Sequence, residues 1–300
     1  MSSTPEAYKI VPPEQATVSV FDRSFQFGDS LYEVTRTYDG IMFSLDEHTR
    51  RLKRSAELAM WEEMPDTDRL LEMTKETCRA FFRKFGNIDV YVRWTVSRGL
   101  GDLNIDRRVS SKPHCLVFVK ELGSVPQSTY EQGMHYAISE RRRNLPSALD
   151  PAMKSGNYLN NILAMAEARR MGADDALMLN YQGFVTEGTT NNVYAVKNGE
   201  VWTAPLSVGI LAGITREWIF QLCKNEGIAI QERLFTRAEL EQCEEMFLSS
   251  SIKEVMAITK LNGQPVTGGK PGAVTKRLGV ALKKLISEYC EKHRTESLYV

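Results

Sequence analysis

The segment "MKSGNYLNNILAMAEA" (153–168) begins with a lysine, Lys154, that is followed at once by the small residues Ser155 and Gly156. Apolar residues after this turn recur at intervals of three and four, which predicts a helix over about 158–171. The core side of that helix is expected to carry Leu159, Ile162, Leu163 and Ala166. A lysine in this position is most often solvent-exposed, so any special role depends on the rest of the chain.

The composition is that of an ordinary soluble globular protein. The 300 residues are enough for two domains, and 42% of them are hydrophobic and 25% charged. A formal net charge of zero favours neither nucleic acid nor an anionic membrane as a partner. The densest basic run, "RRRN" (141–144), is expected to lie on a solvated face. No apolar stretch reaches the ~18 residues of a membrane helix, and the polar start "MSSTPEAYK" is not typical of a signal peptide.

Cysteine and histidine spacing argues against a disulfide framework and against a metal site. The cysteines at positions 78, 115, 223, 243 and 290 are scattered and form no C-x-x-C pair. The histidines likewise lack the spacing of metal ligands. Scattered thiols of this kind are typical of a reducing compartment, so we expect a cytoplasmic protein without a bound metal.

The first third of the chain carries both strand and helix signals. "LYEVTRTYDGIMFSL" (31–45) contains two β-rich runs around Asp39-Gly40, a strong hairpin signal. A helix is predicted over 44–59, where Ser44 and Glu47 have the spacing of a capping box. In "DVYVRWTVSRG" (89–99) apolar and polar residues alternate, which predicts a strand. Its buried face is expected to carry Val90, Val92, Trp94 and Val96, and its other face Tyr91 and Arg93.

The chain is predicted to form two domains. The segment "GSVPQSTYEQG" (123–133) is the best candidate for a linker because of its Gly, Pro and Ser content. It separates a small N-terminal domain, 1–122, from a larger domain, 134–300, in which strands outnumber helices. The fold class is therefore α+β with a mixed sheet.

Four separated segments carry the residues that suggest chemistry: Lys154, Glu187 in "FVTEGTTNN" (184–192), "GITRE" (213–217) and "LSSS" (248–251). Backbone N–H groups at a helix start, together with Thr or Ser hydroxyls, suit a phosphate monoester. A desolvated lysine can form a Schiff base with a carbonyl, and a carboxylate can hold a pyridine nitrogen protonated. Lysine, carboxylate and phosphate cup together describe a site for pyridoxal 5'-phosphate.

The same segments stand in an order that resembles one family. From about Val18 to Leu285 the chain is similar to the fold-type IV pyridoxal-phosphate enzymes, which include branched-chain aminotransferases, D-amino-acid aminotransferases and aminodeoxychorismate lyases. The similar motifs are "FDRSFQFGDSLYEV", "DEHTRRLKRSAE", "YVRWTVSRGLGDLNID", "MKSGNYLNNILAMAEA", "GFVTEGTTNNVYAVKNG", "LAGITRE", "FLSSSIKEV" and "GAVTKRL". The resemblance implies a small α/β N-terminal domain, a larger C-terminal pseudo-barrel domain that binds the cofactor, and a homodimer or higher homo-oligomer. In such an assembly a loop of the small domain completes the site of the partner.

The resemblance also implies a role for each matching residue. Lys154 corresponds to the Schiff-base lysine, Glu187 to the partner of the pyridine nitrogen, and Arg51 to the arginine that grips the cofactor phosphate. Tyr158 corresponds to the tyrosine that hydrogen-bonds the 3'-oxygen, and Leu211 to the apolar residue packed on the ring. The rest of the phosphate cup corresponds to Gly213, Ile214, Thr215, Ser250 and Ser251. Substrate contacts are expected from Phe27, Tyr32, Arg36, Tyr91, Arg93 and Ile252.

The implied reaction is transamination between an amino acid and a 2-oxo acid such as 2-oxoglutarate, in two half-reactions that share Lys154. "DRSFQFGDSLYEV" (22–34) is closest to the D-amino-acid enzymes, but their R-x-H carboxylate trap is absent, because Leu103 and Ile105 stand at the equivalent positions. We therefore favour a hydrophobic or branched-chain L-amino acid as the substrate. The alternative is a D-amino-acid aminotransferase that grips the carboxylate through Arg36 or Arg93, and the third possibility is an aminodeoxychorismate lyase.

Overall fold

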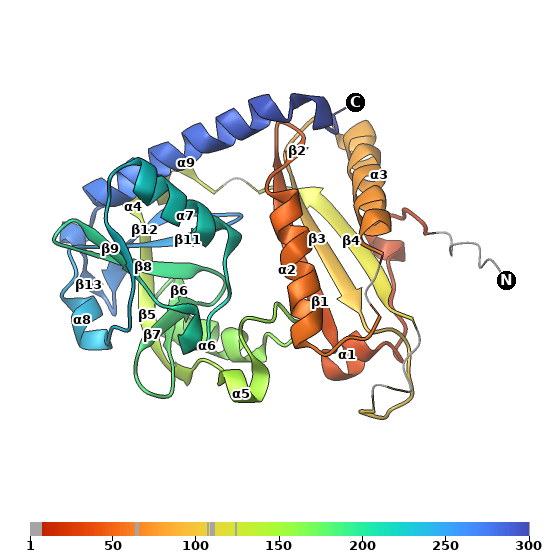
Figure 1. Cartoon of the computed structure of the whole chain (residues 1–300), viewed down its shortest axis with the longest axis horizontal. Helices are drawn as coiled ribbons and strands as arrows, with labels where there is room; N and C mark the ends of the chain where they lie inside the picture. Colours follow the sequence, from red (N-terminus) through yellow and green to blue (C-terminus); the bar gives the residue numbers. More distant parts are fainter. Residues whose placement is uncertain (1–7, 64–65, 107, 109–111, 124, 300) are drawn as a thin grey trace. The chain divides into compact units, whose positions relative to one another are not determined.

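The computed structural model describes residues 8–63, 66–106, 108, 112–123 and 125–299 (Figure 1). These residues form two compact units. The first unit runs up to Leu122 and also includes the segment from His293 onward, and the second unit spans Gly123–Lys292. The sequence had suggested that the larger domain continues to the end of the chain. Instead the last segment bonds within the first unit, where the Leu298 N–H donates to the Gly40 carbonyl at 3.0 Å.

The described part of the first unit contains a four-stranded antiparallel sheet in the order β2-β1-β3-β4. The strands are β1 (Ser30–Tyr38), β2 (Ile41–Met42), β3 (Val90–Ser97) and β4 (His114–Glu121). The helices are α1 (Arg23–Phe27), α2 (Leu45–Leu58) and α3 (Thr67–Phe85), of which α2 packs on β1 and α3 on β4. The predicted hairpin at Asp39-Gly40 is confirmed, and both residues adopt the left-handed backbone that such a turn requires.

Strand β3 has the predicted alternation. Val90, Val92, Trp94 and Val96 are at most 1% exposed, whereas Tyr91 and Arg93 lie half-buried on the other face. The predicted capping box on α2 is wrong. Ser44 has a left-handed backbone (φ 55°) and its side chain makes no capping bond, because a capping hydroxyl reaches the first turn from an extended backbone.

In the second unit, nine strands of the described chain form one sheet in the order β10-β9-β8-β11-β12-β5-β6-β7, with β13 paired to β12. Strand β7 also pairs with β8, so the strands from β8 round to β7 form a closed circuit. The strands are β5 (Met134–Arg142), β6 (Asp175–Leu179), β7 (Val185–Gly188), β8 (Asn192–Lys197), β9 (Glu200–Thr203), β10 (Ile230–Glu232), β11 (Glu245–Ser250), β12 (Glu254–Leu261) and β13 (Gln264–Pro265).

Helices cover this sheet. They are α4 (Gln127–Gln132), α5 (Pro146–Leu149), α6 (Leu159–Arg170), α7 (Ile214–Asn225), α8 (Arg237–Glu241) and α9 (Ala273–Lys292). Helix α6 packs against β5 and β6, whereas α7 packs against both β11 and α9 (Figure 1). Helix α4 lies inside the segment that the sequence suggested as a linker, and there Val125 and Tyr130 pack against the apolar core of the second unit. Ser124, also in that segment, lies outside the described residues.

The predicted core side of α6 is wrong. Leu159 is 66% exposed, Ile162 58% and Leu163 40%, and Ala166 is exposed as well. The helix instead buries Ala164 and Ala168, which pack with alanines of β5 and β6. Small side chains let the helix approach the sheet closely, so its larger apolar residues are left on the outer face.

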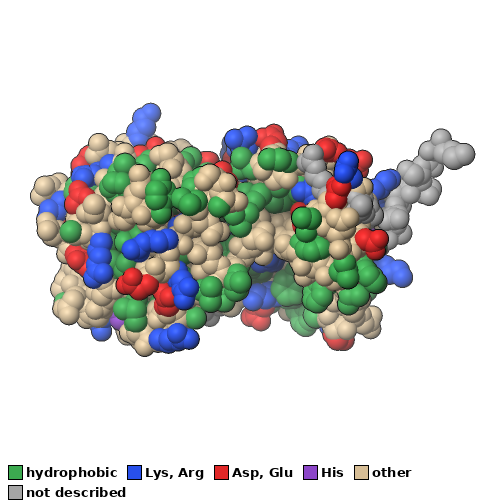
Figure 2. Space-filling model, turned by 90° about the horizontal axis from the view of Figure 1, so that it is seen from below, with side chains coloured by type: hydrophobic (Ala, Val, Ile, Leu, Met, Phe, Trp, Pro, Cys, Tyr) green, Lys and Arg blue, Asp and Glu red, His purple; other side chains and the backbone are tan. Residues whose placement is uncertain are grey.

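Charge is mixed on the one face of the molecule that Figure 2 shows. Lysine and arginine side chains lie interspersed with aspartate and glutamate on the face shown in Figure 2, as the zero net charge suggests. Of the helices that the structure describes, none has both the length and the apolar character needed to cross a bilayer.

Candidate active site

Glu187, the predicted acid of the site, is buried on β7 at 5% exposure. Its Oε1 accepts a hydrogen bond from Nε of Arg143 at 2.8 Å, and its Oε2 accepts one from the Leu211 N–H at 3.0 Å. Arg143 directly follows β5, and its side chain is only 10% exposed. The carboxylate is therefore held in one orientation by two donors from separate parts of the second unit.

Two effects oppose each other in the ionisation of Glu187. Burial raises its pKa above the usual value, while Arg143, the Leu211 N–H and the charge of Lys154 act to lower it. The net direction is upward. Loss of any of the three partners would therefore raise the pKa of Glu187 further.

Neighbouring strands place Glu187 beside the predicted phosphate cup. Glu187 on β7 pairs with Asn192 on β8, and Asn192 in turn pairs with Ser249 on β11. The Asn192 side chain donates to the Leu211 carbonyl at 3.0 Å, which fixes the loop that leads to α7. The acidic residue, the end of β11 and the start of α7 are thus tied together.

The start of α7 has the features of an anion site. Gly213 is the N-cap residue, and Ile214 and Thr215 are buried in the first turn. The N-terminus of a twelve-residue helix presents N–H groups and a partial positive charge. A Cβ on Gly213 would lie 2.0 Å from Oδ1 of Asn192, so only glycine fits between this asparagine and the helix.

Ser250 and Ser251 complete this region from the end of β11, against which α7 packs. Both serines are half-buried, and Oγ of Ser250 accepts a bond from the Lys253 N–H at 3.0 Å that closes the turn to β12. Ile252, predicted to contact substrate, is half-buried in the same turn. The five predicted cup residues therefore belong to two adjacent elements of the second unit.

Lys154 and Tyr158 lie in the segment between α5 and α6. Lys154 is half-buried and close enough to Glu187 for its charge to lower the pKa of that carboxyl. Tyr158 is the N-cap residue of α6 and is half-buried too. The second unit therefore contains Lys154, Glu187 and all five residues of the predicted phosphate cup.

Arg51 belongs to the first unit, on α2, where it forms part of a buried charged group. Its Nε and Nη2 each lie 2.7 Å from an oxygen of Glu33, and Nδ1 of His48 lies 2.8 Å from Glu33 Oε2. Burial alone would raise the pKa of Glu33, but Arg51 and His48 outweigh it and lower this pKa to about 2. The guanidinium is thus oriented by a carboxylate from the sheet below it.

Four predicted substrate residues share one face of the first unit's sheet. Arg36 on β1 stands opposite Tyr91 on β3, and Arg93 on β3 lies near Tyr32 on β1. The Arg93 guanidinium carbon is 4.0 Å from the centroid of the Tyr32 ring, a cation–π contact, and its Nε donates to Thr95 Oγ1 at 3.2 Å. Phe27, at the end of α1, is 37% exposed.

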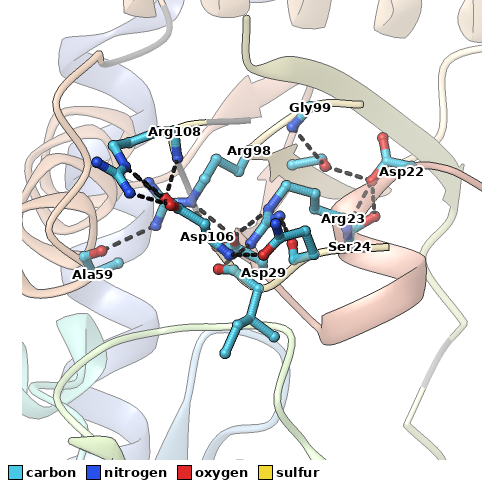
Figure 3. A network of polar contacts seen from close by, with 12 residues as sticks. Asp22, Arg23, Ser24, Asp29, Ala59, Arg98, Gly99, Asp106 and Arg108 are labelled. Atoms are coloured by element: carbon cyan, nitrogen blue, oxygen red, sulfur yellow. Dashed lines mark hydrogen bonds and ion pairs between the residues drawn. The ribbon is translucent and has the colours of Figure 1, made fainter. Parts of the chain in front are cut away.

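The loop after β3 is held by a network of arginines and aspartates (Figure 3). Asp29 accepts from Nε of Arg23 at 3.0 Å and from Nε of Arg98 at 2.8 Å. Arg23, only 3% exposed, also donates to the carbonyls of Asn104 and Ile105 at 2.7 and 3.1 Å. The backbone at the positions of the missing R-x-H trap is thereby fixed, although the Leu103 and Ile105 side chains are 70% and 82% exposed.

These donors suit pyridoxal 5'-phosphate. A helix N-terminus with a glycine cap and adjacent hydroxyls matches a phosphate monoester, and a buried carboxylate paired with an arginine matches a pyridinium nitrogen. Lys154 supplies the amine within electrostatic reach of that carboxylate. Each of these groups belongs to the second unit, so the fit does not depend on the first.

Comparison with known proteins defines the family. Residues 30–261 match the sequence model of the family described as "Amino-transferase class IV". The chain belongs to the class IV aminotransferases and is an enzyme, as the sequence predicted. Members of this class use pyridoxal phosphate.

The relatives include enzymes that are named for each of the two predicted types of substrate. A Methanocaldococcus jannaschii protein provisionally named a branched-chain-amino-acid aminotransferase is 36% identical, over 94% of this chain and 95% of its own length. The D-alanine aminotransferase of Bacillus licheniformis is 32% identical, over 93% and 95%. The branched-chain amino acid aminotransferase of Thermoproteus uzoniensis, solved with norvaline, superposes with a TM-score of 0.85 at 29% identity, covering 94% of each chain. The predicted α+β two-domain fold is thereby confirmed.

Two residues of the site were missed by the sequence reasoning. Arg143 was expected on a solvated face, yet it is buried against Glu187, whereas the Arg141 side chain is 55% exposed and pairs with Glu167. A run of three arginines does not reveal which member turns inward, because that depends on where β5 ends relative to β7. Asn192 stood in the quoted "TEGTTNN" motif, but its contact with Leu211 is visible only once the strands are paired.

Proposed function

We propose that this enzyme binds pyridoxal 5'-phosphate in its second unit and transfers an amino group from a branched-chain or other hydrophobic L-amino acid to a 2-oxo acid such as 2-oxoglutarate. The observation that carries the proposal is the register Glu187–Asn192–Ser249 across three strands, which ties the buried acid to the phosphate cup. Two half-reactions with a shared lysine would follow a ping-pong scheme.

The phosphate would be held by the α7 N-terminus and by hydroxyls. Gly213, Ile214 and Thr215 offer N–H groups at the helix start, and Ser250 and Ser251 offer hydroxyls from the adjacent turn. Arg51, oriented by Glu33, would add a guanidinium, whose paired N–H groups suit phosphate oxygens. Charge-assisted bonds of this kind bind the cofactor without taking part in proton transfer.

When bound, the cofactor supplies an electron-withdrawing ring that stabilises negative charge at the substrate α-carbon. Glu187 would hold a proton at the ring nitrogen, and Arg143 favours the ionised form of the carboxylate that this role needs. The Lys154 amine would remove the α-proton of the amino donor in one half-reaction and deliver a proton to the α-carbon of the acceptor in the other. Leu211 would pack on the ring and Tyr158 would bind the 3'-oxygen, as the family resemblance implies.

The L-specific assignment is supported by the relatives and by the loop after β3. Solved structures similar to this chain include branched-chain aminotransferases of Escherichia coli and Thermoproteus uzoniensis. The side chains of Leu103 and Ile105 have no donor for a carboxylate, so we assign that role to a cation on the sheet face of the first unit. Arg93 would bind the distal carboxylate of 2-oxoglutarate, near Tyr32, Arg36 and Tyr91 on the same sheet face. The family resemblance implies Phe27 and Ile252 as further substrate contacts.

A D-amino-acid aminotransferase is the second candidate, favoured by the 32% identity to the Bacillus licheniformis D-alanine enzyme. In that case Arg36 or Arg93 would bind the α-carboxylate instead. An aminodeoxychorismate lyase remains the third candidate.

Homodimerisation is part of the proposal. Leu159, Ile162, Leu163 and Ala166 form an exposed apolar stripe along α6, and we assign it to the contact between two copies. Burial of such a stripe removes apolar surface from water, which drives most protein association.

The test is a panel of matched L- and D-amino acids with 2-oxoglutarate or pyruvate as acceptor. We expect leucine, isoleucine or valine to be the fastest donors, and Arg93→Ala to raise KM for 2-oxoglutarate far more than for the 2-oxo acid of leucine, which has no second carboxylate. Faster turnover of D-alanine than of any L-amino acid would replace the L-specific assignment by the D-specific one. Absence of transamination with every pair would contradict both.

A further inference from the structure

A second buried polar group lies behind the proposed site, centred on Asp175 at the start of β6. Asp175 is 0% exposed, and its carboxylate is surrounded by donors. Oδ1 accepts from Thr189 Oγ1 at 2.6 Å and from the Ala176 N–H at 2.8 Å. Oδ2 accepts from Tyr136 at 3.1 Å and from Asn191 Nδ2 at 3.2 Å, and it lies 3.5 Å from Nζ of Lys253.

One arm of this group reaches the two elements that carry the proposed chemistry. Thr189 belongs to the turn that follows Glu187, and its carbonyl accepts from Nδ2 of Asn161 at 2.7 Å. Asn161 is 5% exposed on α6, the helix that follows Lys154. A chain of buried hydrogen bonds, Asp175–Thr189–Asn161, therefore ties the segment after the acid to the segment after the lysine.

The other arm reaches the phosphate cup. Lys253 is the residue whose N–H closes the turn onto Ser250, and its ammonium group pairs with Asp175. Glu254, the next residue, has a left-handed backbone (φ 55°), so this turn adopts a conformation that needs support from its neighbours. The ion pair between Lys253 and Asp175 therefore helps to hold the turn that carries Ser250 and Ser251.

We propose that Asp175 is a positioning residue that sets the geometry of Glu187 relative to Lys154 through Thr189 and the geometry of the phosphate cup through Lys253. This role rests on the aminotransferase function proposed above. Asp175 itself touches neither cofactor nor substrate. It acts by holding two separate parts of the site to one buried carboxylate.

The carboxylate suits this place because each group around it can donate to it. An asparagine in place of Asp175 would keep one acceptor oxygen and present an NH₂ group, from which a hydroxyl can accept but a backbone N–H, an amide nitrogen or an ammonium cannot. Burial, and next the charge of Asp175, raise the pKa of Tyr136 well above its usual value, so that hydroxyl remains a donor. Unpaired donors in a buried site displace their neighbours, and a displacement of about 1 Å in an active site lowers rates by about 100-fold.

The experiment compares three variants that cut this group at different points. Asp175→Asn removes the common acceptor, Thr189→Val cuts only the arm to Glu187 and Lys154, and Lys253→Met cuts only the arm to the cup. The controls are Asp174→Asn, a neighbouring carboxylate that is half exposed, and Lys260→Met, an exposed lysine on β12. Thermal unfolding without cofactor checks that each variant is folded.

Two readouts separate the arms. The equilibrium affinity for pyridoxal 5'-phosphate, with inorganic phosphate as competitor, reports the cup. Exchange of the α-hydrogen of leucine for deuterium, followed by NMR at saturating cofactor, reports Glu187 and Lys154. We expect Lys253→Met to weaken cofactor binding about tenfold with exchange preserved, and Thr189→Val to slow exchange about 100-fold with binding preserved. Asp175→Asn should show both effects and the two controls neither.

Each other outcome contradicts the proposal. If Asp175→Asn is folded and matches the controls in both readouts, or if the variants lose only thermal stability, Asp175 is a structural residue. Should Asp175→Asn fail to fold, the two single-arm variants decide in the same way. Failure of the unmodified enzyme to bind pyridoxal 5'-phosphate would overturn the proposed function, and this inference with it, whereas normal binding and exchange in all variants would overturn the inference alone.

Discussion

Arg143 and Glu187 form a buried ion pair at 2.8 Å, between the end of β5 and strand β7. The guanidinium and carboxylate side chains are 10% and 6% exposed, so solvent screens this pair little. Burial raises the pKa of Glu187, and the charge of Arg143 is the strongest of the effects that act to lower it.

Replacing Arg143 with glutamine should therefore raise the pKa of Glu187. The role proposed for Glu187 requires the ionised carboxylate, so the acidic limb of the pH–rate profile should move to higher pH, and the single-turnover rate at neutral pH should fall about tenfold or more. Arg141→Gln, at a more exposed arginine two residues earlier, is the matched control. An unchanged profile in Arg143→Gln would show that Leu211 and Lys154 suffice.

The buried carboxyl group of Glu33 should make the stability of the first unit depend on pH. Its pKa falls from a usual value of 4.5 to about 2 in the folded chain. A carboxyl group whose pKa is lower in the folded chain stabilises the fold at pH values above its pKa in the unfolded chain. This contribution, roughly 3 kcal/mol, is lost as the pH falls from 4.5 toward 2, and more than half of it is lost by pH 3. Denaturant unfolding at pH 6 and pH 3 should show this loss in the unmodified chain and in Glu57→Gln, an exposed control on α2, but not in Glu33→Gln.

Arg51 should matter for cofactor affinity rather than for chemistry. Loss of a partly buried, charge-assisted contact in Arg51→Ala should weaken pyridoxal phosphate binding by roughly 2–4 kcal/mol, and excess cofactor should restore much of the activity. Arg50→Ala is the control, because the Arg50 side chain is 71% exposed. If both variants saturate at the same cofactor concentration, Arg51 serves only to pair with Glu33.

The stripe on α6 should control assembly. Ile162→Lys introduces a charge into its centre, which should halve the molecular mass seen by sedimentation or light scattering. Val280→Lys, at an apolar residue on α9 that is 70% exposed, should leave the mass unchanged. The interface lies elsewhere if the two variants assemble alike.

The sequence predicted those parts of the structure in which local pattern and tertiary environment agree. Strand β3 alternates because one face packs against the core and the other does not, and a hairpin at Asp39-Gly40 follows from backbone preference alone. The ordered motifs singled out Glu187 and Gly213 as candidate site residues. They did not show why position 213 is a glycine, because the reason is the side chain of Asn192 on strand β8.

Errors arose where tertiary contacts overrode the local signal. The apolar spacing of α6 correctly indicated a helix, but alanines rather than leucines face the sheet, since only small residues allow that close approach. Ser44 had the right spacing for a cap, yet its backbone is left-handed. Arg143 and Asp175 gave no signal in the sequence, because their roles depend on which strands lie side by side.

The most direct test of the account is reduction of the protein with borohydride in the presence of pyridoxal 5'-phosphate, followed by peptide mass spectrometry. The account predicts a single modified lysine, Lys154, and loss of both the label and turnover in Lys154→Ala, with Lys253→Met still labelled at Lys154. Label at another lysine, or turnover that survives in Lys154→Ala, would contradict it.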